Sequence, residues 1–446
     1  MTNLSIKRLK IKNFKGIEAL ELHFNEKLNV LIGKNGMGKT SVLFALAMAL
    51  SRFIGRIRSL NSNGITFFPA DIKNNANEAT IEVEMIYRKR NINWRIGKQR
   101  HQTKQTITNL EDINKMVLEV NENLVRDPNC PIPVVILYGV SRSVLDIPLK
   151  IKKTHIFEQL AAYDEALRGE RRENDFRLFF EWFRNREDVE NETIRDLVQP
   201  NFFDNNHSSF TIRKIASRDS QLEAVRKAIH AIIPAFSDLR VRRNPLRMVV
   251  TKSTNSTKEE LNISQLSEGE KCTLALAGDL ARRLSIANPT MNNPLCGDGI
   301  VLIDEIDLHL HPQWERQIMP CLRQTFPNCQ FIVTTHSPQV LSELEPESIF
   351  ILSEKDEKIA VHHPELAKGL SVNDILGSMM DDPARNQDIA EKLKEIDCLL
   401  EEENVEEARA KLEGLKSDLH GKKTPEMCGQ EAMLGMLEAG VLSDND

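Results

Sequence analysis

The chain has 446 residues, of which 59 are Lys or Arg and 65 are Asp or Glu, so its formal net charge is −6. This length suits two domains and allows a sizeable hydrophobic core without disulfides or metal ions to stabilise it. The acidic balance excludes a general electrostatic argument for nucleic-acid binding, which would need a local basic patch.

The cysteines and the N-terminus predict the compartment. Seven cysteines are scattered without CxxC spacing, which indicates a reducing compartment, no zinc module, and thiols buried as small hydrophobic groups. The N-terminal stretch MTNLSIKRLKIKNF carries charges where a signal peptide needs an apolar core, and no apolar run approaches the length of a membrane span. We therefore expect a cytoplasmic protein without a membrane segment.

The N-terminal third predicts strands around one buried helix. Residues 4–14 alternate apolar and basic side chains, and residues 27–33 form a short apolar run that ends in glycine. Residues 41–55 are apolar nearly all round, as in a helix packed inside a core. Residues 79–99 predict a β-hairpin that turns near Asn91 to Asn93, and residues 133–142 predict another buried strand.

The rest of the chain divides into an insertion, a second α/β part and an acidic end. Residues from about 150 to 235 are charged and helical, interrupted by NFFDNNHSS, and predict an inserted lid or arm. Helices and strands then alternate, which implies a parallel sheet covered by helices. The expected elements are a strand at 238–252, a polar loop at 251–260, helices at 265–286 and 311–326, strands at 299–307 and 329–336, and a charged helix around 388–418.

A phosphate-binding loop is predicted at residues 33–40. GKNGMGKT matches GxxxxGK[ST] between a predicted strand and a predicted helix. Its glycines let backbone N–H groups surround phosphates, Lys39 reaches the β- and γ-phosphates, and Thr40 is a magnesium ligand. The predicted nucleotide-binding residues of the loop are Asn35, Gly36, Gly38, Lys39, Thr40 and Ser41.

An apolar strand at 300–303 ends in two acids, Asp304 and Glu305. Asp304 is predicted to hold Mg²⁺, directly or through water, and Glu305 to polarise the attacking water as general base. The alternative is a strand that simply leaves the core. Together with the phosphate loop, these acids predict an ATP hydrolase that uses ATP and Mg²⁺.

Two further motifs narrow the class. LSEGEK at 266–271 opens a helix with Ser267 at the capping position, although an ordinary capping box has the same pattern. TTHSP at 334–338 places His336 at a strand end after the acidic strand. In this order the motifs resemble those of the ABC-type ATPases of the RecF, SMC and Rad50 group, over residues about 1–140 and 240–350.

That resemblance implies further roles. Ser267 and Gly269 would contact the γ-phosphate of ATP held by the opposite subunit, and His336 would be a switch histidine that contacts the γ-phosphate. Residues 307–311 would form the D-loop at the dimer interface. A glutamine that links magnesium to the lever in many relatives is not found around residues 68–71.

A closer resemblance spans nearly the whole chain. The stretches LSEGEKCTLALAGDLARRL, GIVLIDEIDLHLHPQWERQIMPCL, FPNCQFIVTTHSPQVL and DFRLFFEWFRNREDVEN resemble PtuA-type ATPases of Septu and retron-associated antiphage defence systems. The resemblance implies a head that pairs with itself on binding ATP and regulates a separate HNH-type nuclease, with DNA or retron nucleic acid as a further partner.

Two other functions are possible for this class. We do not expect an overcoming-lysogenization-type nuclease, because its Toprim domain would need an acid-glycine motif and paired aspartates after His336, whereas the sequence there continues into an acidic helix and leaves no room for that fold. A RecF/SMC-like repair ATPase that clamps DNA stays as the alternative, supported by two basic runs that a solvated sheet face also explains. These runs are Arg88, Lys89, Arg90, Arg95, Lys98 and Arg100, and Arg240, Arg242, Arg243 and Arg247.

Other side chains predict structural roles. The aromatic cluster at 176–183 has helical spacing and is more typical of an insertion core or subunit contact than of base stacking. Four histidines have no further metal-ligating residues at a suitable spacing and are predicted to be structural: His309, His311, His362 and His363. The tail at 425–442 is rich in Met, Leu and Ala and suits a helix-in-groove contact.

The predicted fold class is therefore α/β: an ABC-type ATPase head with a mixed, mainly parallel sheet covered by helices, an inserted helical lever and a helical C-terminal segment. The predicted parts are 1–149 and 239–355 for the head, 150–238 for the lever or arm, and 356–446 for a helical partner or oligomer contact.

Overall fold

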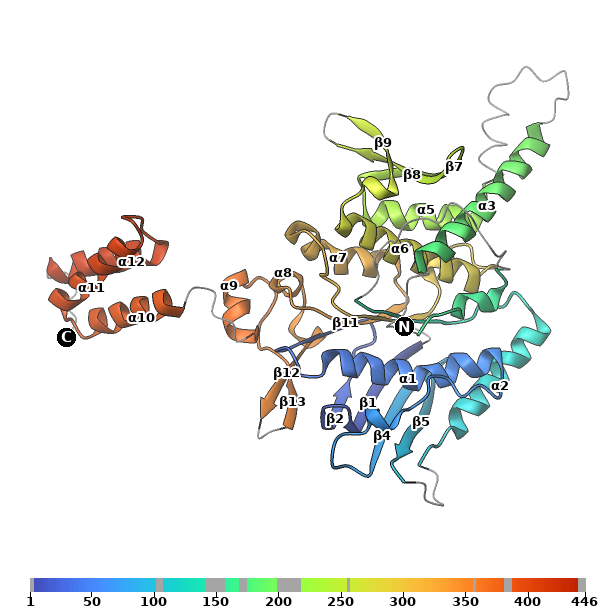
Figure 1. Ribbon diagram of the computed structural model, residues 1–446, viewed down its shortest axis with the longest axis horizontal. Coiled ribbons are helices and arrows are strands. Elements are labelled where there is room, and N and C mark those ends of the chain that lie inside the picture. Colours follow the sequence, from blue (N-terminus) through green and yellow to red (C-terminus); the bar gives the residue numbers. More distant parts are fainter. Residues whose placement is uncertain are drawn as a thin grey trace. The chain divides into compact units, whose positions relative to one another are not determined.

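The computed structural model describes residues 4–101, 107–140, 157–167, 175–198, 218–254, 257–355, 358–380 and 387–439. The chain forms two compact units that divide after Leu370. The first unit, called the head below, contains three β-sheets and their covering helices (Figure 1). The predicted boundaries at 149/150 and 238/239 fall within the head and stay predictions.

A six-stranded sheet forms the centre of the head, in the order β13-β12-β3-β11-β10-β6. The five strands from β12 to β6 run parallel, whereas β13 pairs antiparallel with β12. Strands β3, β6, β10 and β11 are buried along their whole length, as expected where helices cover both faces of a parallel sheet. The predicted α/β class with a helix-covered parallel sheet is confirmed. The strands are β3 (Leu28–Ile32), β6 (Val134–Tyr138), β10 (Gly299–Ile303), β11 (Cys329–Thr334), β12 (Ile349–Lys355) and β13 (Lys358–His362).

An antiparallel sheet in the order β2-β1-β4-β5 forms a second layer. Buried and less buried residues alternate strictly along β4, because one of its faces packs on the core. Its strands are β1 (Leu4–Phe14), β2 (Ile17–His23), β4 (Glu78–Tyr87) and β5 (Arg90–Gln99).

The turn of the β4–β5 hairpin differs from the prediction. It lies at Arg88 and Lys89, whose φ angles are 48° and 66°, and not at Asn91 to Asn93. Two-residue hairpin loops favour positive φ at both central positions because that twist matches the strands. The asparagines instead lie on the exposed face of β5 and alternate with buried Ile92 and Trp94.

Helix α1 (Lys39–Arg58) lies between the two sheets, and α2 (Glu111–Arg126) lies beside it (Figure 1). By length and composition α1 is apolar enough to cross a membrane, contrary to our expectation that no run approaches a span. However, 67% of its most apolar window is buried inside the protein. Its apolar surface is therefore accounted for by packing between the sheets.

Helices α3, α5, α6 and α7 lie on the other side of the six-stranded sheet (Figure 1). The predicted interpretation of the aromatic cluster as core is confirmed, since Phe176, Phe179, Phe180, Trp182 and Phe183 are all buried. Helix α3 approaches α6 closely, because a Cβ at Gly278 would lie 2.9 Å from the Phe179 ring. The helices are α3 (Asp175–Val198), α5 (Ser220–Ile232), α6 (Glu268–Ala287), α7 (Pro312–Thr325) and the short α8 (Pro338–Leu341).

A three-stranded antiparallel sheet, β7-β8-β9, completes the head. The predicted strand at 238–252 is a hairpin of two strands, and the predicted polar loop at 251–260 overlaps β8 and includes the start of β9. The predicted NFFDNNHSS interruption lies outside the described residues. The strands are β7 (Phe236–Arg243), β8 (Leu246–Ser253) and β9 (Lys258–Asn262).

The second unit is helical. The predicted single helix at 388–418 is wrong: the chain breaks at Glu403, where φ is 57°, and forms two helices that bury their apolar sides in a shared core with a third helix. Cys398 and Cys428 are exposed, so the expectation of buried thiols fails for both. The unit contains α9 (Val372–Ile375), α10 (Gln387–Glu401), α11 (Val405–Asp418) and α12 (Pro425–Glu438).

Candidate nucleotide-binding site

The predicted phosphate loop connects β3 to α1. Gly36 and Gly38 have φ angles of 86° and 84°, a conformation that residues with a side chain rarely adopt. Gly38 is the residue before the first turn of α1, so the free N–H groups of that helix start open toward the loop. Backbone N–H groups at a helix N-terminus suit phosphate, so the loop has the form that a nucleotide requires.

Lys39 is held inside this loop. Lys39 is only 7% exposed, and its Nζ donates to the carbonyl oxygens of Gly33 at 2.6 Å and Lys34 at 3.1 Å. Burial lowers the pKa of Lys39, whereas the charges of Asp304 and Glu305 oppose that shift. Its ammonium group therefore lies at the loop, facing neutral carbonyls that a phosphate oxygen would replace.

The two predicted metal ligands lie together although 264 residues separate them in sequence. Thr40 Oγ1 donates to the Asp304 carboxylate at 2.9 Å from Oδ2 and 3.2 Å from Oδ1. Thr334 Oγ1, at the end of β11, donates to Asp304 Oδ1 at 2.6 Å. A hydroxyl and a carboxylate are hard oxygen ligands of the kind that Mg²⁺ prefers, so these residues fit that ion.

The predicted catalytic residues follow two neighbouring parallel strands, β10 and β11. Glu305 has a φ of 49°, and its N–H donates to Thr334 Oγ1 at 2.7 Å. His336 N–H donates to Asp307 Oδ1 at 3.3 Å, and Thr335 Oγ1 donates to the same oxygen at 2.6 Å. The turn after Asp304 is thus tied to the strand end that carries His336, next to the phosphate loop.

The LSEGEK turn is both a capping box and a close neighbour of the D-loop. Ser267 is exposed at the start of α6, and its hydroxyl accepts the N–H of Glu270. A Cβ at Gly269 would lie 2.3 Å from the carbonyl oxygen of His309, whose own φ is 62°. Only glycine therefore permits this close approach between residues 307–311 and the LSEGEK turn, which is called the signature turn below.

Two local details were missed or left open by the sequence. Thr334 joins Asp304 to Glu305, whereas the TTHSP pattern by itself predicts a role only for the histidine. A polar residue that ends an apolar strand beside the acidic strand was the available signal. At residues 68–71, where the linking glutamine was sought, Asp71 Oδ2 accepts the N–H of Phe68 at 2.8 Å and caps its own short turn.

Two of the histidines predicted to be structural, His311 and His363, make structural contacts. His311 Nδ1 accepts the N–H of Gln313 at the start of α7. His363 Nδ1 bonds the Ile349 carbonyl at 2.7 Å, and its ring lies edge-on to Phe350. Among the described residues, no group of three or more His, Cys, Asp or Glu side chains has the arrangement of a metal cluster.

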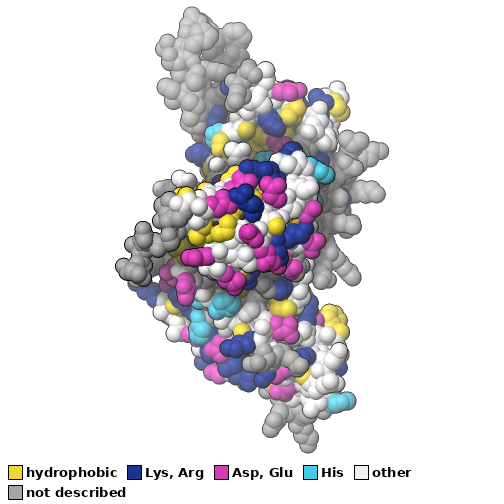
Figure 2. All heavy atoms as spheres, turned by 90° about the vertical axis from the view of Figure 1, so that its left-hand side faces the viewer, with side chains coloured by type: hydrophobic (Ala, Val, Ile, Leu, Met, Phe, Trp, Pro, Cys, Tyr) yellow, Lys and Arg dark blue, Asp and Glu magenta, His cyan; other side chains and the backbone are white. Residues whose placement is uncertain are grey.

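Much of the basic character that favoured direct DNA clamping is paired with acids. Arg95 contacts Glu82, Arg240 and Arg242 contact Glu260, and Arg243 contacts Asp188. The face shown in Figure 2 likewise has blue and magenta side chains interspersed. These pairs agree with a solvated sheet face and reduce the positive charge available to a phosphate backbone.

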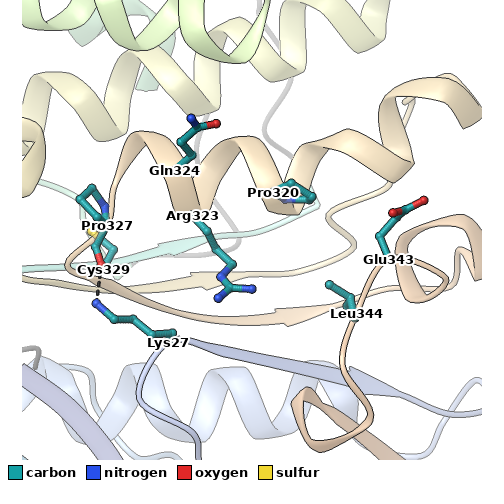
Figure 3. Close-up of a pocket in the computed structure, with 8 residues that line it drawn as sticks. All are labelled: Lys27, Pro320, Arg323, Gln324, Pro327, Cys329, Glu343 and Leu344. Carbon is teal, nitrogen blue, oxygen red and sulfur yellow. Dashed lines mark hydrogen bonds between the residues drawn. The ribbon is translucent and has the colours of Figure 1, made fainter. Parts of the chain in front are cut away.

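A cavity of about 320 Å³ lies apart from the predicted nucleotide residues (Figure 3). Lys27, which lines it, donates to the carbonyl oxygen of Pro327, and Arg323 extends into it from α7. None of the residues predicted to bind nucleotide or metal lines this cavity. The predicted nucleotide-binding residues therefore belong to the loop between β3 and α1 and the strand ends beside it, not to this cavity.

Residues 28–342 match the family described as "AAA domain, putative AbiEii toxin, Type IV TA system". The chain belongs to this family. It is 33% identical over 396 residues to the retron Ec83 probable ATPase of Escherichia coli, covering 78% of this chain and 71% of that protein. It is 30% identical to the retron Vc95 probable ATPase of Vibrio cholerae serotype O1 biovar El Tor, covering 81% and 76%. It is 26% identical to the Septu protein PtuA of Bacillus thuringiensis, covering 90% and 91%.

These relatives confirm the predicted resemblance to retron and Septu ATPases. The chain is an ATPase of that defence-associated kind, and its AAA domain binds nucleotide.

Proposed function

We propose that this chain is the ATPase subunit of a cytoplasmic antiphage defence complex, in which ATP pairs two heads and thereby regulates an HNH-type nuclease supplied by another chain. The proposed pairing is supported by the exposed position of Ser267 at the start of α6. The close approach of Gly269 to the His309 carbonyl oxygen fixes this helix start against the D-loop. A serine hydroxyl and the backbone N–H groups at a helix N-terminus are donors of the kind that suit a phosphate oxygen.

In this proposal different residues of each head bind the phosphates of ATP, hold Mg²⁺ and activate the attacking water. The phosphate loop, from Asn35 to Ser41, binds the phosphates, and Lys39 contacts the β- and γ-phosphates. Thr40 and Asp304 would hold Mg²⁺, which neutralises phosphate charge when bound. Glu305 accepts a proton from the attacking water, and His336 contacts the γ-phosphate.

The signature turn of the second head completes the site. Ser267 and Gly269 would meet the γ-phosphate from the opposite side, so the heads separate once hydrolysis and phosphate release remove that contact. The inserted arm, whose base is α3 and α5, would carry the change toward a nuclease, and the C-terminal helical unit supplies a further surface for partner or subunit contact. The nuclease partner comes from the resemblance to PtuA-type ATPases stated in the sequence analysis, not from a nuclease motif in this chain.

The pairing is tested by light scattering of the purified full chain with ATP and Mg²⁺. Ser267→Arg should bind ATP normally but remain unpaired, because the long cation fills the space of the contact. Lys39→Ala is the matched control: it should also remain unpaired, but through loss of ATP binding. Equal pairing of Ser267→Arg and the wild type would contradict the trans contact.

A further inference from the structure

Both hydrogen-bonding functions of the Ser267 hydroxyl are used within its own chain. The oxygen accepts the N–H of Glu270 at 3.3 Å, and the proton is directed to Glu270 Oε2 at 3.0 Å. The same carboxylate oxygen accepts the Ser267 N–H at 2.9 Å. A serine hydroxyl has a single proton, so it must leave Glu270 before it can donate to a phosphate.

Glu270 has a second partner that comes from a different element. Lys252, on β8, places Nζ 2.6 Å from Glu270 Oε1, and the two side chains are 32% and 10% exposed. Burial alone would raise the pKa of Glu270, but the hydrogen bonds from Lys252 and Ser267 outweigh it and lower that pKa. The carboxylate is thus negative, close to the serine, and neutralised from one side by lysine.

We propose that the Lys252–Glu270 pair sets the availability of the Ser267 hydroxyl to the ATP of a second head, an inference that rests on the proposed trans contact. Glu270 retains the hydroxyl proton and repels an incoming phosphate, and Lys252 weakens both effects by drawing the negative charge toward Oε1. Glu270 and Lys252 are therefore positioning residues with opposite effects on ATP-dependent pairing.

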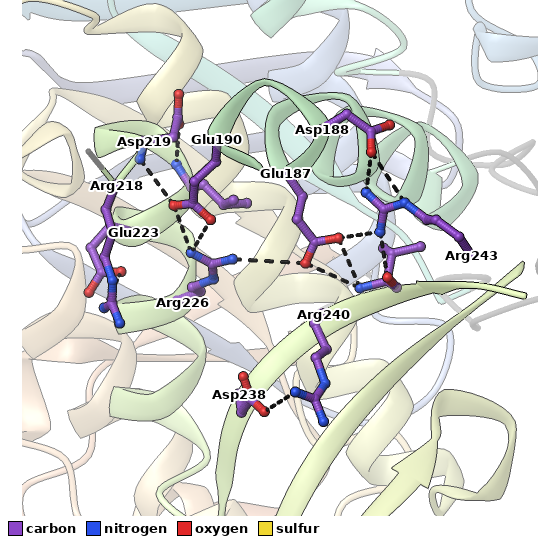
Figure 4. Close-up of polar contacts among 12 residues, drawn as sticks. Glu187, Asp188, Glu190, Arg218, Asp219, Glu223, Arg226, Asp238, Arg240 and Arg243 are labelled. Atoms are coloured by element: carbon purple, nitrogen blue, oxygen red, sulfur yellow. Dashed lines mark hydrogen bonds and ion pairs between the residues drawn. The ribbon is translucent and has the colours of Figure 1, made fainter. Parts of the chain in front are cut away.

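The location of Lys252 connects this pair to the base of the inserted arm. Lys252 lies on β8, which pairs with β7. On β7, the N–H of Val241 donates to Glu187 of α3 at 3.1 Å, and Arg243 contacts both Glu187 and Asp188 (Figure 4). A shift of α3 would thus move the β7–β8 hairpin and change the Lys252–Glu270 contact.

The test is the ATP concentration that gives half-maximal pairing, measured by light scattering with Mg²⁺ in full-length Glu305→Gln protein, where hydrolysis is slow. Lys252→Met should raise this concentration about three- to tenfold, because the carboxylate is no longer neutralised. Glu270→Gln should lower it by about the same factor, because glutamine still serves a capping box but is a weaker acceptor for the hydroxyl proton. The double variant Lys252→Met/Glu270→Gln should pair at the same ATP concentration as Glu270→Gln alone.

The controls separate this role from a structural one. Lys252→Arg keeps the charge and should pair like the parent protein, and Lys115→Met, which breaks an exposed pair with Glu111 on α2, should change nothing. If Lys252→Met and Glu270→Gln both weaken pairing, or neither alters it, the inference is wrong. Ser267→Arg in the same background distinguishes the two failures: if it pairs normally, the trans contact itself is absent.

Discussion

Asp304 and Asp279 are two buried aspartates joined through the same strand residue, yet their surroundings differ. The N–H of Asp304 donates to the Tyr138 carbonyl, and the Tyr138 hydroxyl donates to Asp279 at 3.0 Å. Asp304 receives hydroxyl hydrogen bonds from Thr40 and Thr334. Asp279 contacts two buried guanidinium groups, those of Arg282 and Arg283, at 2.6 and 2.7 Å.

The difference shows how the fold gives two buried aspartates different surroundings: Asp304 suits a bound cation, whereas Asp279 neutralises arginines in the core. The hydroxyl donors Thr40 and Thr334 orient the Asp304 carboxylate, whose oxygens are ligands of the kind that a hard cation prefers. At Asp279, burial would raise the pKa, but the charges of Arg283 and Arg282 outweigh it and hold the pKa well below its usual range. The charge of Asp279 is thus used inside the core, where removing one partner would leave buried cations uncompensated.

The largest expected effect is the loss of ATP turnover when Glu305 is replaced. Glu305→Gln should retain ATP binding but slow hydrolysis by roughly 10²–10⁴, the usual contribution of a positioned general base. The measurement is phosphate release at saturating ATP, with ATP affinity measured separately by equilibrium binding. Unchanged turnover would remove Glu305 from the role of base.

A matched pair of substitutions tests the comparison itself. Asp279→Asn should lower the free energy of unfolding by about 3–5 kcal/mol, because it leaves two buried arginines without a full counter-charge. Asp304→Asn should abolish turnover while changing that free energy by no more than about 1 kcal/mol, because the hydroxyls of Thr40 and Thr334 that donate to Asp304 can also donate to an amide oxygen. Urea unfolding and phosphate release are measured for both variants, and equal destabilisation would contradict the distinction.

The smallest expected effect is the acid dependence of the Asp279 contribution. Because its pKa in the folded chain lies below the ordinary value of 3.8, its stabilisation is fully present above about pH 4 and declines as pH falls below that. The stability difference between the wild type and Asp279→Asn should therefore shrink by up to about 1.4 kcal/mol per pH unit below that value. Urea midpoints between pH 7 and pH 3 measure it, and a constant difference would mean that Asp279 is not strongly ionised in the fold.

The sequence by itself determined the local motifs and most of the elements. Three motifs each depend on the backbone conformation of a few consecutive residues, which their side chains favour directly. They are GKNGMGKT, the strand that ends in Asp304 and Glu305, and the cap at Ser267. Apolar runs likewise marked the parallel strands. The sequence misplaced the turn after β4, since Arg88 and Lys89 adopt positive φ without glycine, and it missed the break at Glu403.

The tertiary structure alone decided which distant side chains meet. Thr40 reaches Asp304 across 264 residues, and Lys252 of β8 reaches Glu270 of α6. Such contacts depend on how strands and helices pack, and a sequence with many lysines and glutamates offers many equivalent pairings on local grounds. Packing selects among them, and it thereby places Asp304 against two threonine hydroxyls and Asp279 against two arginines.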